Sequence, residues 1–600
     1  MQIKNSLLIT LGHNSSAILV YYNGTRIIGY EQERIDGIKS SSAFPSGAIF
    51  KIAEVLGMQY MQGCKVYISH WFDCDKSGHK FKPSKYMTEI DMANLLAFTT
   101  LENISFCDSL DTHHDAHACS ALAFFKYHAH TNDVFKVGEH MKGEDIHVIV
   151  ADGFGTNGEV LSIYKTKLDS TSLDLVTSVR NYPASFGLMY QYATSFTGMK
   201  ENQDEYKYLG YEAHIGEYCD LEEIDRLDYY IESTVEHLKN ARLNKNGYIS
   251  NGHDLINFDN LNIVKNWWHS WFEEVLMNSC NETEILFDSF KARVMIAYLI
   301  QQSLEISMTR ILDEYDIKNC IVVGGVFYNV KLNNKILTHI PGIFCAAPLA
   351  GDQGAAIGMF YIDTINKYPM YDFPFKSLCI GERKLHGIEK FKIPNMKHVI
   401  VDSDAKRFDV IKQIATDIVN NKIVNLVSGP MEFGPRALCN TSTLMLPTQE
   451  LVGINNYLNN RNEVMPCAPV MLKRNAEHLF DKNELDRVIG SDNFMICTHD
   501  YSVWHTNSMA GVMHKKPLED VYTGRPQIVS DDSFIGQILQ KVEYMCGERA
   551  LVNTSFNTHG RPIAFETMDI IHNFNYQTSR INSQLAKDLD FFKLYIIDIE

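Results

Sequence analysis

The sequence predicts an α/β protein whose N-terminal part contains the same unit twice. Residues 7–11 are apolar and β-compatible, the small polar turn Gly12–Ser16 follows, and residues 17–22 return as a second strand. About 140 residues later, residues 147–165 again have the pattern strand, Gly-rich turn, strand. Helical sequence lies between the two units, so we expect two similar halves with a cleft between them. Two unrelated hairpins are the alternative interpretation.

The other N-terminal elements are indicated by apolar residues at helical spacing and by short apolar runs. Residues 26–31 continue the first hairpin as a third strand, and residues 320–323 are a buried strand that ends at Gly324-Gly325. After a further strand over 343–347, the turn Gly351–Gly354 opens a helix of small residues. Residues 166–285 show only a mixed pattern. The remaining expected helices are residues 46–57, 90–102, 112–127, 290–315 and 329–338.

The sequence changes in character near residue 370. Pro369, Pro374 and Gly381 interrupt the regular patterns, as is typical of a linker. Beyond them, a helix over 405–420 and a strand over 423–427 begin a second α/β unit. We therefore expect an N-terminal domain over residues 1–370, a linker over 371–398 and a C-terminal domain over 399–600.

The composition is that of a globular protein with reduced thiols. Hydrophobic residues make up 45% of the 600 residues, so a disordered chain is not expected. With 55 basic and 73 acidic residues, the net charge is −18, which disfavours sequence-independent adhesion to nucleic acid. The 13 scattered cysteines do not form a disulfide scaffold, and no apolar run approaches membrane-spanning length. We expect a cytoplasmic protein without a membrane segment.

Three histidines lie within five residues at the start of the helix expected over 112–127. His113 and His117 are four residues apart, so both imidazoles lie on one face of that helix. Neutral imidazole nitrogens suit a divalent metal, and a carboxylate from elsewhere would complete the ligand set. Asp352, in a turn at a predicted helix start, is the best candidate. The alternative is a His-containing surface helix that binds no metal.

Four Gly-rich turns each follow a predicted strand: Gly12–Ser16, Asp152–Gly155, Gly324-Gly325 and Gly351–Gly354. Backbone N–H groups in such turns, and at the helix starts after them, can bind phosphate oxygens. Four of them in one domain favour a nucleotide cleft, although each alone is more often only a turn. Asp152, at a strand end, could hold a Mg²⁺ water or a ribose hydroxyl.

Two further polar features of the N-terminal domain have both functional and structural interpretations. His13 lies on the first Gly-rich turn, where it could act as a general base, or could only cap the turn. The segment Glu205-Tyr206-Lys207 combines a carboxylate, a phenol and an amine, and such a segment is usually a solvated face.

In the C-terminal domain, the segment Gly429–Leu438 places two prolines and two glycines around Arg436. A rigidly presented guanidinium suits a carboxylate, carbamate or phosphate. Hydroxyl and amide side chains gather again at Asn553–Asn557, after a strand. Arg461 and Arg525 could add positive charge, with surface ion pairs as the alternative role for each arginine.

Together these residues resemble the O-carbamoyltransferases of the nodulation-protein and antibiotic-biosynthesis type. The resemblance spans nearly the whole chain and rests on eight motifs in the family's order. They are Gly12–Ala17, His113–Ala118, Asp152–Gly155, Glu205–Lys207, Gly324–Val326, Gly351–Gly354, Met431–Leu438 and Asn553–Asn557.

The resemblance implies an N-terminal domain of the duplicated actin-like ATPase (ASKHA) fold, similar to the tRNA threonylcarbamoyl-transfer enzymes. It also implies a YrdC-like α/β C-terminal domain, similar to the partner that makes threonylcarbamoyl adenylate. In such proteins the C-terminal domain makes carbamoyl adenylate from carbamoyl phosphate and ATP, and the N-terminal domain transfers the carbamoyl group to a hydroxyl. The implied cofactors are ATP, Mg²⁺ and a divalent metal, most often Fe²⁺.

The resemblance also implies roles for individual residues. It makes His113, His117 and Asp352 the metal ligands, and it gives His13 the position of the base for the acceptor hydroxyl. The expected transfer site, which binds nucleotide or carbamoyl adenylate, consists of Gly12, Asn14, Asp152, Gly153, Lys207, Gly324 and Gly325. The expected C-terminal site for carbamoyl phosphate and ATP consists of Arg436, Arg461, Arg525, Asn553 and Ser555.

The chain departs from the family in the C-terminal domain. Asn459 and Asn462 stand where the family usually has the Lys and Glu of a Lys-x-Arg-Glu segment. Cys439 replaces a usual Gly, Thr441 a usual Arg, and Arg561 a usual Glu. We expect these changes to leave the transfer site in better order than the adenylate-forming site.

The sequence leaves the acceptor open among a small molecule, a sugar and a hydroxymethylated pyrimidine, free or in DNA. Two other functions stay open as alternatives. One is a threonylcarbamoyl-type enzyme that modifies tRNA, and the other is a non-catalytic nucleotide-binding regulator with a decayed adenylate site.

Overall fold

The computed structural model covers most of the chain. It describes residues 3–69, 83–106, 110, 112–131, 141, 143–243, 248–250, 255–257, 260–282, 284–461, 464, 467–502, 507–584 and 591–599. None of the helices within these ranges is both long enough and apolar enough to cross a membrane.

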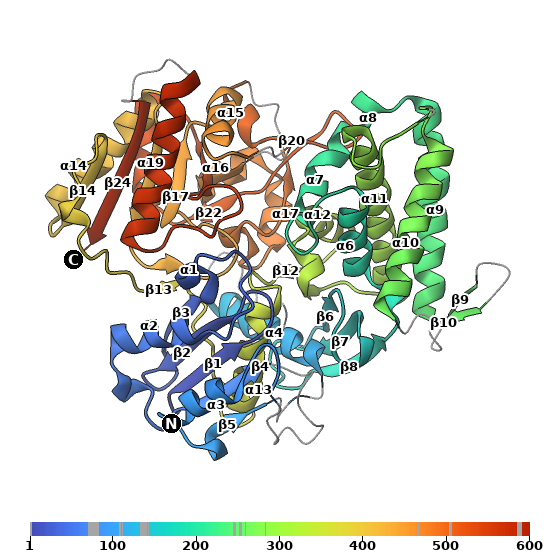
Figure 1. Cartoon of the computed structure of the whole chain (residues 1–600), viewed down its shortest axis with the longest axis horizontal. Helices are drawn as coiled ribbons and strands as arrows, with labels where there is room; N and C mark the ends of the chain where they lie inside the picture. Colours follow the sequence, from blue (N-terminus) through green and yellow to red (C-terminus); the bar gives the residue numbers. More distant parts are fainter. Residues whose placement is uncertain are drawn as a thin grey trace.

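The first sheet has five strands in the order β3-β2-β1-β4-β5 (Figure 1). The central strand β1 pairs antiparallel with β2 and parallel with β4, and all its residues are buried. The strands are β1 (Ser6–Thr10), β2 (Ser16–Tyr21), β3 (Arg26–Glu31), β4 (Lys65–Ser69) and β5 (Ile104–Ser105). Its helices are α1 (Gln32–Asp36), α2 (Ser46–Leu56) and α3 (Glu89–Leu96).

The second sheet repeats this topology, with the order β8-β7-β6-β11-β12 when read from the opposite edge. Here β6 takes the place of β1, since it pairs antiparallel with β7 and parallel with β11. The strands are β6 (Ile146–Ala151), β7 (Leu161–Thr166), β8 (Asp174–Val179), β11 (Cys320–Val323) and β12 (Phe344–Ala346). The duplicated α/β architecture predicted from the sequence is therefore confirmed.

Two helices of small residues, α4 (His113–Thr131) and α13 (Ala355–Ile365), share one apolar core with strands of both sheets. They cross closely at Gly358, where a Cβ would lie 1.9 Å from the carbonyl oxygen of Ala116. Only glycine permits this approach. The crossing brings the first turn of α4 beside the turn that precedes α13.

Helices pack on the second half, at the right of Figure 1, and those between residues 186 and 279 lie in the region whose mixed pattern did not predict them. Trp268 and Phe272, both fully buried, lie in the core that α10 shares with α6, α9 and α11. The helices are α6 (Phe186–Phe196), α7 (Tyr208–Tyr211), α8 (Ile215–Tyr218), α9 (Leu221–Leu243), α10 (Leu261–Ser279), α11 (Phe290–Glu314) and α12 (Val330–His339). A small hairpin, β9 (Tyr248–Ser250) and β10 (Leu255–Asn257), completes this half.

The C-terminal part is a seven-stranded mixed sheet in the order β14-β24-β15-β17-β23-β18-β22, with helices packed on it. Its strands are β14 (Met396–Val401), β15 (Ile423–Ser428), β17 (Thr441–Met445), β18 (Ala468–Leu472), β22 (Gln527–Val529), β23 (Ala550–Ser555) and β24 (Phe592–Ile599). Its helices are α14 (Asp404–Val419), α15 (Gln449–Leu458), α16 (Lys473–Leu479), α17 (Lys482–Arg487), α18 (Phe534–Cys546) and α19 (Thr567–Gln584). A small sheet in the order β19-β21-β20 lies beside it, made of β19 (His499–Asp500), β20 (His514–Lys515) and β21 (Tyr522–Gly524).

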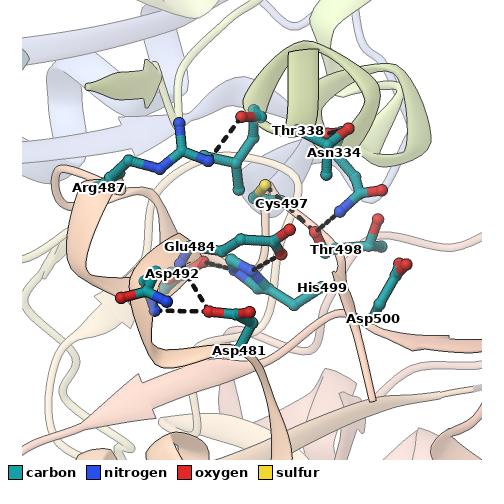
Figure 2. A network of polar contacts seen from close by, with 12 residues as sticks. Asn334, Thr338, Asp481, Glu484, Arg487, Asp492, Cys497, Thr498, His499 and Asp500 are labelled. Carbon is teal, nitrogen blue, oxygen red and sulfur yellow. Dashed lines mark hydrogen bonds and ion pairs between the residues drawn. The ribbon is translucent and has the colours of Figure 1, made fainter. Parts of the chain in front are cut away.

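The two parts of the chain are bonded to each other at more than one place. Val488, just after α17, forms a parallel bridge with Phe344 and so extends the second sheet past β12. Figure 2 shows the polar contacts that follow, in which the Asn334 amide of α12 donates to the carbonyl of Thr498 at 2.9 Å. Elsewhere, β13 (Cys379–Gly381), within the expected linker, pairs with β16 (Met431–Glu432). The segment that carries Arg436 is therefore attached to the linker.

Candidate functional site

Four side chains gather where the two N-terminal halves meet: His113, His117, Asp152 and Asp352. The Nε2 atoms of the two histidines lie 2.9 Å apart. Asp352 Oδ1 lies 3.1 Å from Nε2 of His113, and Asp152 Oδ2 lies 3.5 Å from Nε2 of either histidine. We call these four residues the metal cluster.

The local sequence explains why the two histidines project from the first turn of α4. Thr112 and Asp115 form a capping box, in which the Thr112 N–H donates to Asp115 and the Asp115 N–H donates to the Thr112 hydroxyl. The Tyr164 hydroxyl also donates to Asp115, at 2.8 Å. Because the helix start is fixed in this way, the spacing of His113 and His117 places both rings on the same side.

The third histidine of the motif faces away from the metal cluster. His114 is fully buried, and its Nδ1 lies 2.8 Å from the hydroxyl of Ser162 on β7. Burial, with the nearby His113, lowers the pKa of His114 to about 3, so its ring is neutral at physiological pH. The structure thus separates a buried structural histidine from the pair that shares a face.

The electrostatic environment of the metal cluster favours a cation. Burial by itself lowers the pKa of His113, but hydrogen bonds and charge interactions with Asp152 and Asp352 outweigh it and raise that pKa to about 10. For both aspartates, burial raises the pKa while the two histidines lower it, and the net direction is down. Two partly buried carboxylates are stabilised by positive charge between them, which a divalent ion would supply in place of a proton.

The donor set and the distances fit such an ion. Ligand atoms about 2.1 Å from one ion lie roughly 3.0–3.4 Å apart in octahedral or tetrahedral geometry. The histidine–histidine and histidine–aspartate distances run from 2.9 to 3.5 Å, and all four ligand atoms lie within 4.8 Å of one another. Two imidazole nitrogens with two carboxylate oxygens suit first-row divalent metals better than Ca²⁺ or Mg²⁺, which prefer oxygen alone.

The four predicted Gly-rich turns converge on this cluster. A Cβ at Gly12 would lie 3.9 Å from Asp352 Oδ2, and one at Gly325 would lie 2.9 Å from Asp152 Oδ1. Gly155 packs on the rings of His113 and His114, and Gly324, with φ of +103°, lies against Ala151 at the end of β6. Gly351 directly precedes Asp352. The turns therefore meet at one place, the expected cleft, where their backbone approaches the metal cluster closely.

Other residues of the expected transfer site lie along or beyond this cleft. His13 is exposed on the Gly12 turn, and Asn14 adopts a positive φ of 62° there. Gly153 donates its N–H to Asp152 Oδ1 at 2.8 Å and supports α6 at Gly187. Lys207 pairs with Asp204 at 2.9 Å, and the charge of His559 from the C-terminal part also acts on Asp204.

The C-terminal part contributes a second cluster, made of arginines. Arg461 donates to the Thr554 hydroxyl at 2.6 Å, and to the Ser555 hydroxyl and carbonyl at 3.0 Å each. Ser555, like Asn553, lies on β23 itself, because that strand runs further than the sequence predicted. Within the described residues, Arg461 forms no ion pair with a carboxylate.

Arg436 and Arg525 lie close enough for their charges to interact. Burial lowers the pKa of both, and the charge of Arg436 lowers that of Arg525 further. Neither has a carboxylate partner in the part of the chain that the structure describes. Two adjacent cations without an anion are costly to bury, and a bound anion would relieve that cost.

Asn553 connects the backbones on which these two arginines stand. Its Nδ2 donates to Gln527 Oε1 at 2.6 Å and to the carbonyl of Ala437 at 2.8 Å. Ala437 is next to Arg436, and Gln527 is two residues from Arg525. Asn553 therefore ties the segment of Arg436 to that of Arg525, and among the described residues its own buried Oδ1 has no hydrogen-bond partner.

Tyr328 links the arginines with the metal cluster. The charge of Arg436 acts on its hydroxyl, which donates to Gln353 Oε1 at 3.3 Å. A Cβ at Gly351 would lie 3.2 Å from the Tyr328 ring. Since Gly351 and Gln353 flank Asp352, Tyr328 contacts the turn that carries this aspartate and is also near Arg436.

The departure at residue 459 has a structural explanation. Asn459 is fully buried, donates to Asn455 Oδ1 at 2.9 Å and accepts from Gln577 at 2.7 Å. Gln577 in turn accepts from Asn425, which accepts from the Thr443 hydroxyl. The side chain that replaces the family's lysine thus belongs to a chain of buried amides in the core of the C-terminal part. Asn462 lies outside the described residues, and Arg561 is exposed.

Sequence reasoning gave Asp152 another role. It suggested a Mg²⁺ water or a ribose hydroxyl as its partner, whereas Asp152 directly follows β6 and lies in the metal cluster with the histidines. The sequence did contain a sign of this role. Asp152 comes directly after the central strand of the second sheet, and the Gly12 turn has the corresponding position in the first sheet. Arg383 was not singled out, although it donates to the Thr441 hydroxyl at 2.6 Å and burial lowers its pKa.

Fold and site together define a two-part α/β protein that contains a candidate metal site and a cluster of arginines without carboxylate partners in the described part of the chain. The chain belongs to the carbamoyltransferase family. Residues 7–360 match the family's carbamoyltransferase N-terminus model, and residues 415–584 match its carbamoyltransferase C-terminus model. It is therefore a transferase enzyme, and its recognition from the eight motifs is confirmed.

Similar proteins include nodulation proteins. Nodulation protein NolNO of Sinorhizobium fredii is 23% identical over 590 residues, which cover 94% of this chain and 77% of that protein. Nodulation protein U of the same organism is 26% identical over 250 residues, 41% of this chain and 40% of that protein. An uncharacterized protein of Methanocaldococcus jannaschii is 28% identical over 461 residues, 75% of this chain and 80% of its own length.

Solved structures that match part of the chain include HypF of T. kodakarensis, at a TM-score of 0.28 and 12% identity over 61% of this chain and 48% of that one. A ROK family glucokinase from Streptomyces griseus has a TM-score of 0.25 and 10% identity over 60% of this chain and 99% of its own. Similarity at this level adds nothing to the fold that the strand order already defines.

Proposed function

We propose that the protein is an ATP-dependent O-carbamoyltransferase that uses carbamoyl phosphate and transfers the carbamoyl group through carbamoyl adenylate to a hydroxyl. The observation that carries the proposal is a pair of partly buried arginines, Arg436 and Arg525, with no carboxylate partner within the described residues, near Tyr328 and the cluster of two histidines and two aspartates. An anionic donor suits the first cluster and a metal-assisted transfer suits the second. The nodulation proteins among the relatives and the family models are consistent with this function.

In this proposal the chain is divided as the sequence suggests, with transfer over residues 1–370, a linker over 371–398 and adenylate formation over 399–600. Arg436, Arg461 and Arg525 bind the anionic oxygens of carbamoyl phosphate and ATP, while Asn553 and Ser555 hold these arginines in place. With one water, carbamoyl phosphate and ATP give carbamoyl adenylate, phosphate and pyrophosphate.

The second step takes place at the cleft lined by the Gly-rich turns. The acceptor oxygen attacks the carbamoyl carbon, the bond from that carbon to the adenylate oxygen breaks, and AMP leaves. His13 would accept the proton of the hydroxyl, because it lies on the turn next to Asp352 and is exposed to a bound acceptor. Backbone N–H groups of the turns at Gly12, Gly153 and Gly324 would bind the adenylate.

His113, His117, Asp152 and Asp352 would hold the metal, for which Fe²⁺ is our first candidate. A bound divalent ion supplies Lewis acidity at the transfer site. Closure of the interface around Tyr328 would keep carbamoyl adenylate away from water. The acceptor would be a small molecule, a sugar or a hydroxymethylated nucleotide.

The test is incubation of the protein with carbamoyl phosphate, ATP, Mg²⁺ and Fe²⁺, with and without a panel of hydroxyl acceptors. We expect AMP and pyrophosphate in amounts that depend on carbamoyl phosphate, and an acceptor whose mass grows by one carbamoyl group. ATP hydrolysis at a rate that does not depend on carbamoyl phosphate would contradict the proposal. So would the absence of ATP turnover with every acceptor. The second result would favour a nucleotide-binding regulator.

A further inference from the structure

The loop that carries Arg436 is held by an ion pair from the opposite part of the chain. Glu31 ends β3, and Arg34 lies in α1, the short helix that follows it. The N–H of Gly434 donates to Glu31 Oε2 at 3.1 Å, and Arg34 Nη2 donates to the carbonyl of Gly434 at 2.8 Å. Both polar groups of a single residue, two positions before Arg436, are thus bound by the N-terminal part.

The pair that makes these contacts is itself closely organised. Arg34 Nη2 lies 3.0 Å from Glu31 Oε2, and Nη1 lies 2.6 Å from Glu33 Oε1. The side chains of Arg34 and Glu31 are only 3% and 2% exposed. A buried ion pair adds little stability compared with apolar packing, so this arrangement is better explained by the geometry that it imposes.

A second carboxylate holds the loop beyond Arg436. Glu432 Oε1 accepts from the N–H groups of Leu438, Asn440 and Thr441 at 2.8–3.0 Å. At the loop's start, Gly434 has φ of +98° and lies so close to Leu349 that a Cβ would be 2.9 Å from its Cδ2. The loop is therefore fixed on both sides of Arg436. Among its hydrogen bonds within the described residues, those to Glu31 and Arg34 are the ones that come from the transfer part, which also contacts the loop through apolar side chains such as Leu349.

We propose that Glu31 and Arg34 are positioning residues for Arg436, which set the distance of its guanidinium from Arg525 and thereby the affinity for carbamoyl phosphate. This inference rests on the proposed function of the arginine pair. Displacement of a binding group by about 1 Å can cost on the order of 100-fold in rate. Because the pair belongs to the transfer part, it also makes the adenylate-forming site depend on the docking of the two parts.

The chain offers a matched control at Arg487. This arginine also binds the opposite part through backbone carbonyls, those of Leu337, Ile340 and Gly342 at 2.6–3.0 Å. Figure 2 shows it at the end of α12, in the network around His499, which includes none of the proposed anion-binding arginines. Loss of Arg487 removes a comparable contact between the parts and leaves the Gly434 loop untouched.

The experiment compares Arg34→Gln, Arg34→Lys and Arg487→Gln in the full-length protein. Pyrophosphate release is measured against the concentration of carbamoyl phosphate at saturating ATP. We expect Arg34→Gln to raise the KM for carbamoyl phosphate about 10- to 100-fold, with a smaller change in the KM for ATP. Arg34→Lys keeps the positive charge beside Glu31 and Glu33 but loses the guanidinium nitrogen that donates to the Gly434 carbonyl. Its KM for carbamoyl phosphate should therefore lie between those of the wild type and Arg34→Gln. Arg487→Gln should stay within about twofold of the wild type.

Equal KM values for Arg34→Gln and the wild type, or equal increases in Arg34→Gln and Arg487→Gln, would overturn the proposal. If Arg34→Gln does not fold, Arg34→Lys decides, and an unchanged KM in that variant also overturns it. Hydrogen exchange of the peptide over residues 432–441 supplies a readout that needs no activity. We expect faster exchange there in the Arg34 variants and not in Arg487→Gln.

The hydrogen-exchange arm also separates this inference from the proposed function. A wild-type protein that releases no pyrophosphate with carbamoyl phosphate sinks the proposed function. If exchange of residues 432–441 in the Arg34 variants is then slower or unchanged, the positioning role is excluded as well. If exchange is faster, the Arg34 side chain still positions the loop, and the arginine pair binds an anion other than carbamoyl phosphate.

Discussion

The two clusters at the interface are opposite in charge and in how that charge is balanced. The metal cluster combines two aspartates with two histidines, and its field raises the pKa of His113 to about 10. The arginine pair has no carboxylate within the described residues, and burial lowers the pKa of Arg436 and Arg525. The metal cluster attracts a cation and the arginine pair attracts an anion, and Tyr328 lies near both Arg436 and the turn that carries Asp352.

The two clusters also differ in which parts of the chain hold their side chains in place. The metal cluster is built from side chains of one part of the chain, on α4 and on two turns. The arginine pair depends on contacts from elsewhere, namely Asn553 on β23 and the Glu31–Arg34 pair of the other part. We therefore expect substitutions in the metal cluster to change metal binding and substitutions in the arginine pair to change donor binding. We also expect the arginine site, and not the metal cluster, to depend on how the two parts of the chain pack against each other.

The largest effect is expected for Arg525→Leu. It removes one of two cations that would stabilise an anionic donor, so kcat/KM for carbamoyl phosphate should fall by about 100- to 1000-fold. Metal content, measured by elemental analysis after dialysis, should stay at the wild-type level. A normal kcat/KM in this variant would show that Arg525 does not touch the donor.

The next effect concerns the metal cluster. His117→Ala, Asp352→Asn and Asp152→Asn should each lower the affinity for a divalent metal by at least about tenfold, because each removes or neutralises one ligand. The matched control is His114→Asn, which keeps a nitrogen near Ser162 and should retain the metal. Normal metal binding by Asp152→Asn would leave Asp152 with the nucleotide role that the sequence suggested.

The same contrast shows what the sequence could predict. The repeated strand, Gly-turn, strand pattern predicted the two sheets because each central strand is a short apolar run bounded by a Gly-rich turn. The His113–His117 face followed from helical spacing alone. The missed helices α9 and α10 had a signal, since Ile224, Leu227 and Ile231 recur at helical spacing, but their charged and aromatic neighbours obscured it.

Contacts between residues far apart in the chain could not be predicted from the sequence. Nothing local to Asp152 relates it to His113 across a helix and a turn, and nothing local to Glu31 indicates Gly434, 403 positions away. For Asn459 the sequence suggested a contact that the structure does not place there. Its position in the motif suggested a lost phosphate contact, but its side chain lies in the core. Such pairings depend on how the sheets and domains pack, which one chain's pattern does not encode.

A smaller effect, on stability, is expected in the network between the parts. Burial alone lowers the pKa of His499, but Asp492 at 2.9 Å and Glu484 at 3.8 Å raise it to about 9 (Figure 2). The folded protein thus holds this proton more tightly than the unfolded chain. The associated stability is complete below about pH 6.5 and is lost as the pH rises to about 9, a change of up to about 3 kcal/mol.

His499→Gln should therefore lose most of the difference in thermal midpoint between pH 6.5 and pH 9, measured by scanning fluorimetry. At the lower pH the variant should be less stable than the wild type, and at the higher pH the two should approach each other. Parallel pH profiles for the two proteins would exclude His499 as the titrating group. Since the network lies away from the arginine pair, the KM for carbamoyl phosphate should not follow this titration.

The smallest effect is expected for Asn459→Lys, which restores the residue usual in the family. A restored phosphate contact would improve the KM for carbamoyl phosphate. Asn459 is fully buried in an amide chain with Gln577 and Asn425, so an ammonium there would lack an anion and leave the Gln577 amide without its acceptor. We expect a loss of about 1–3 kcal/mol in stability and no gain in KM. Asn459→Ala is the control, because it breaks the same amide chain without adding charge. A lower KM in Asn459→Lys together with an unchanged thermal midpoint would mean that the backbone at residue 459 can turn its side chain toward Arg461, and that the arginine site is less completely fixed than the metal cluster.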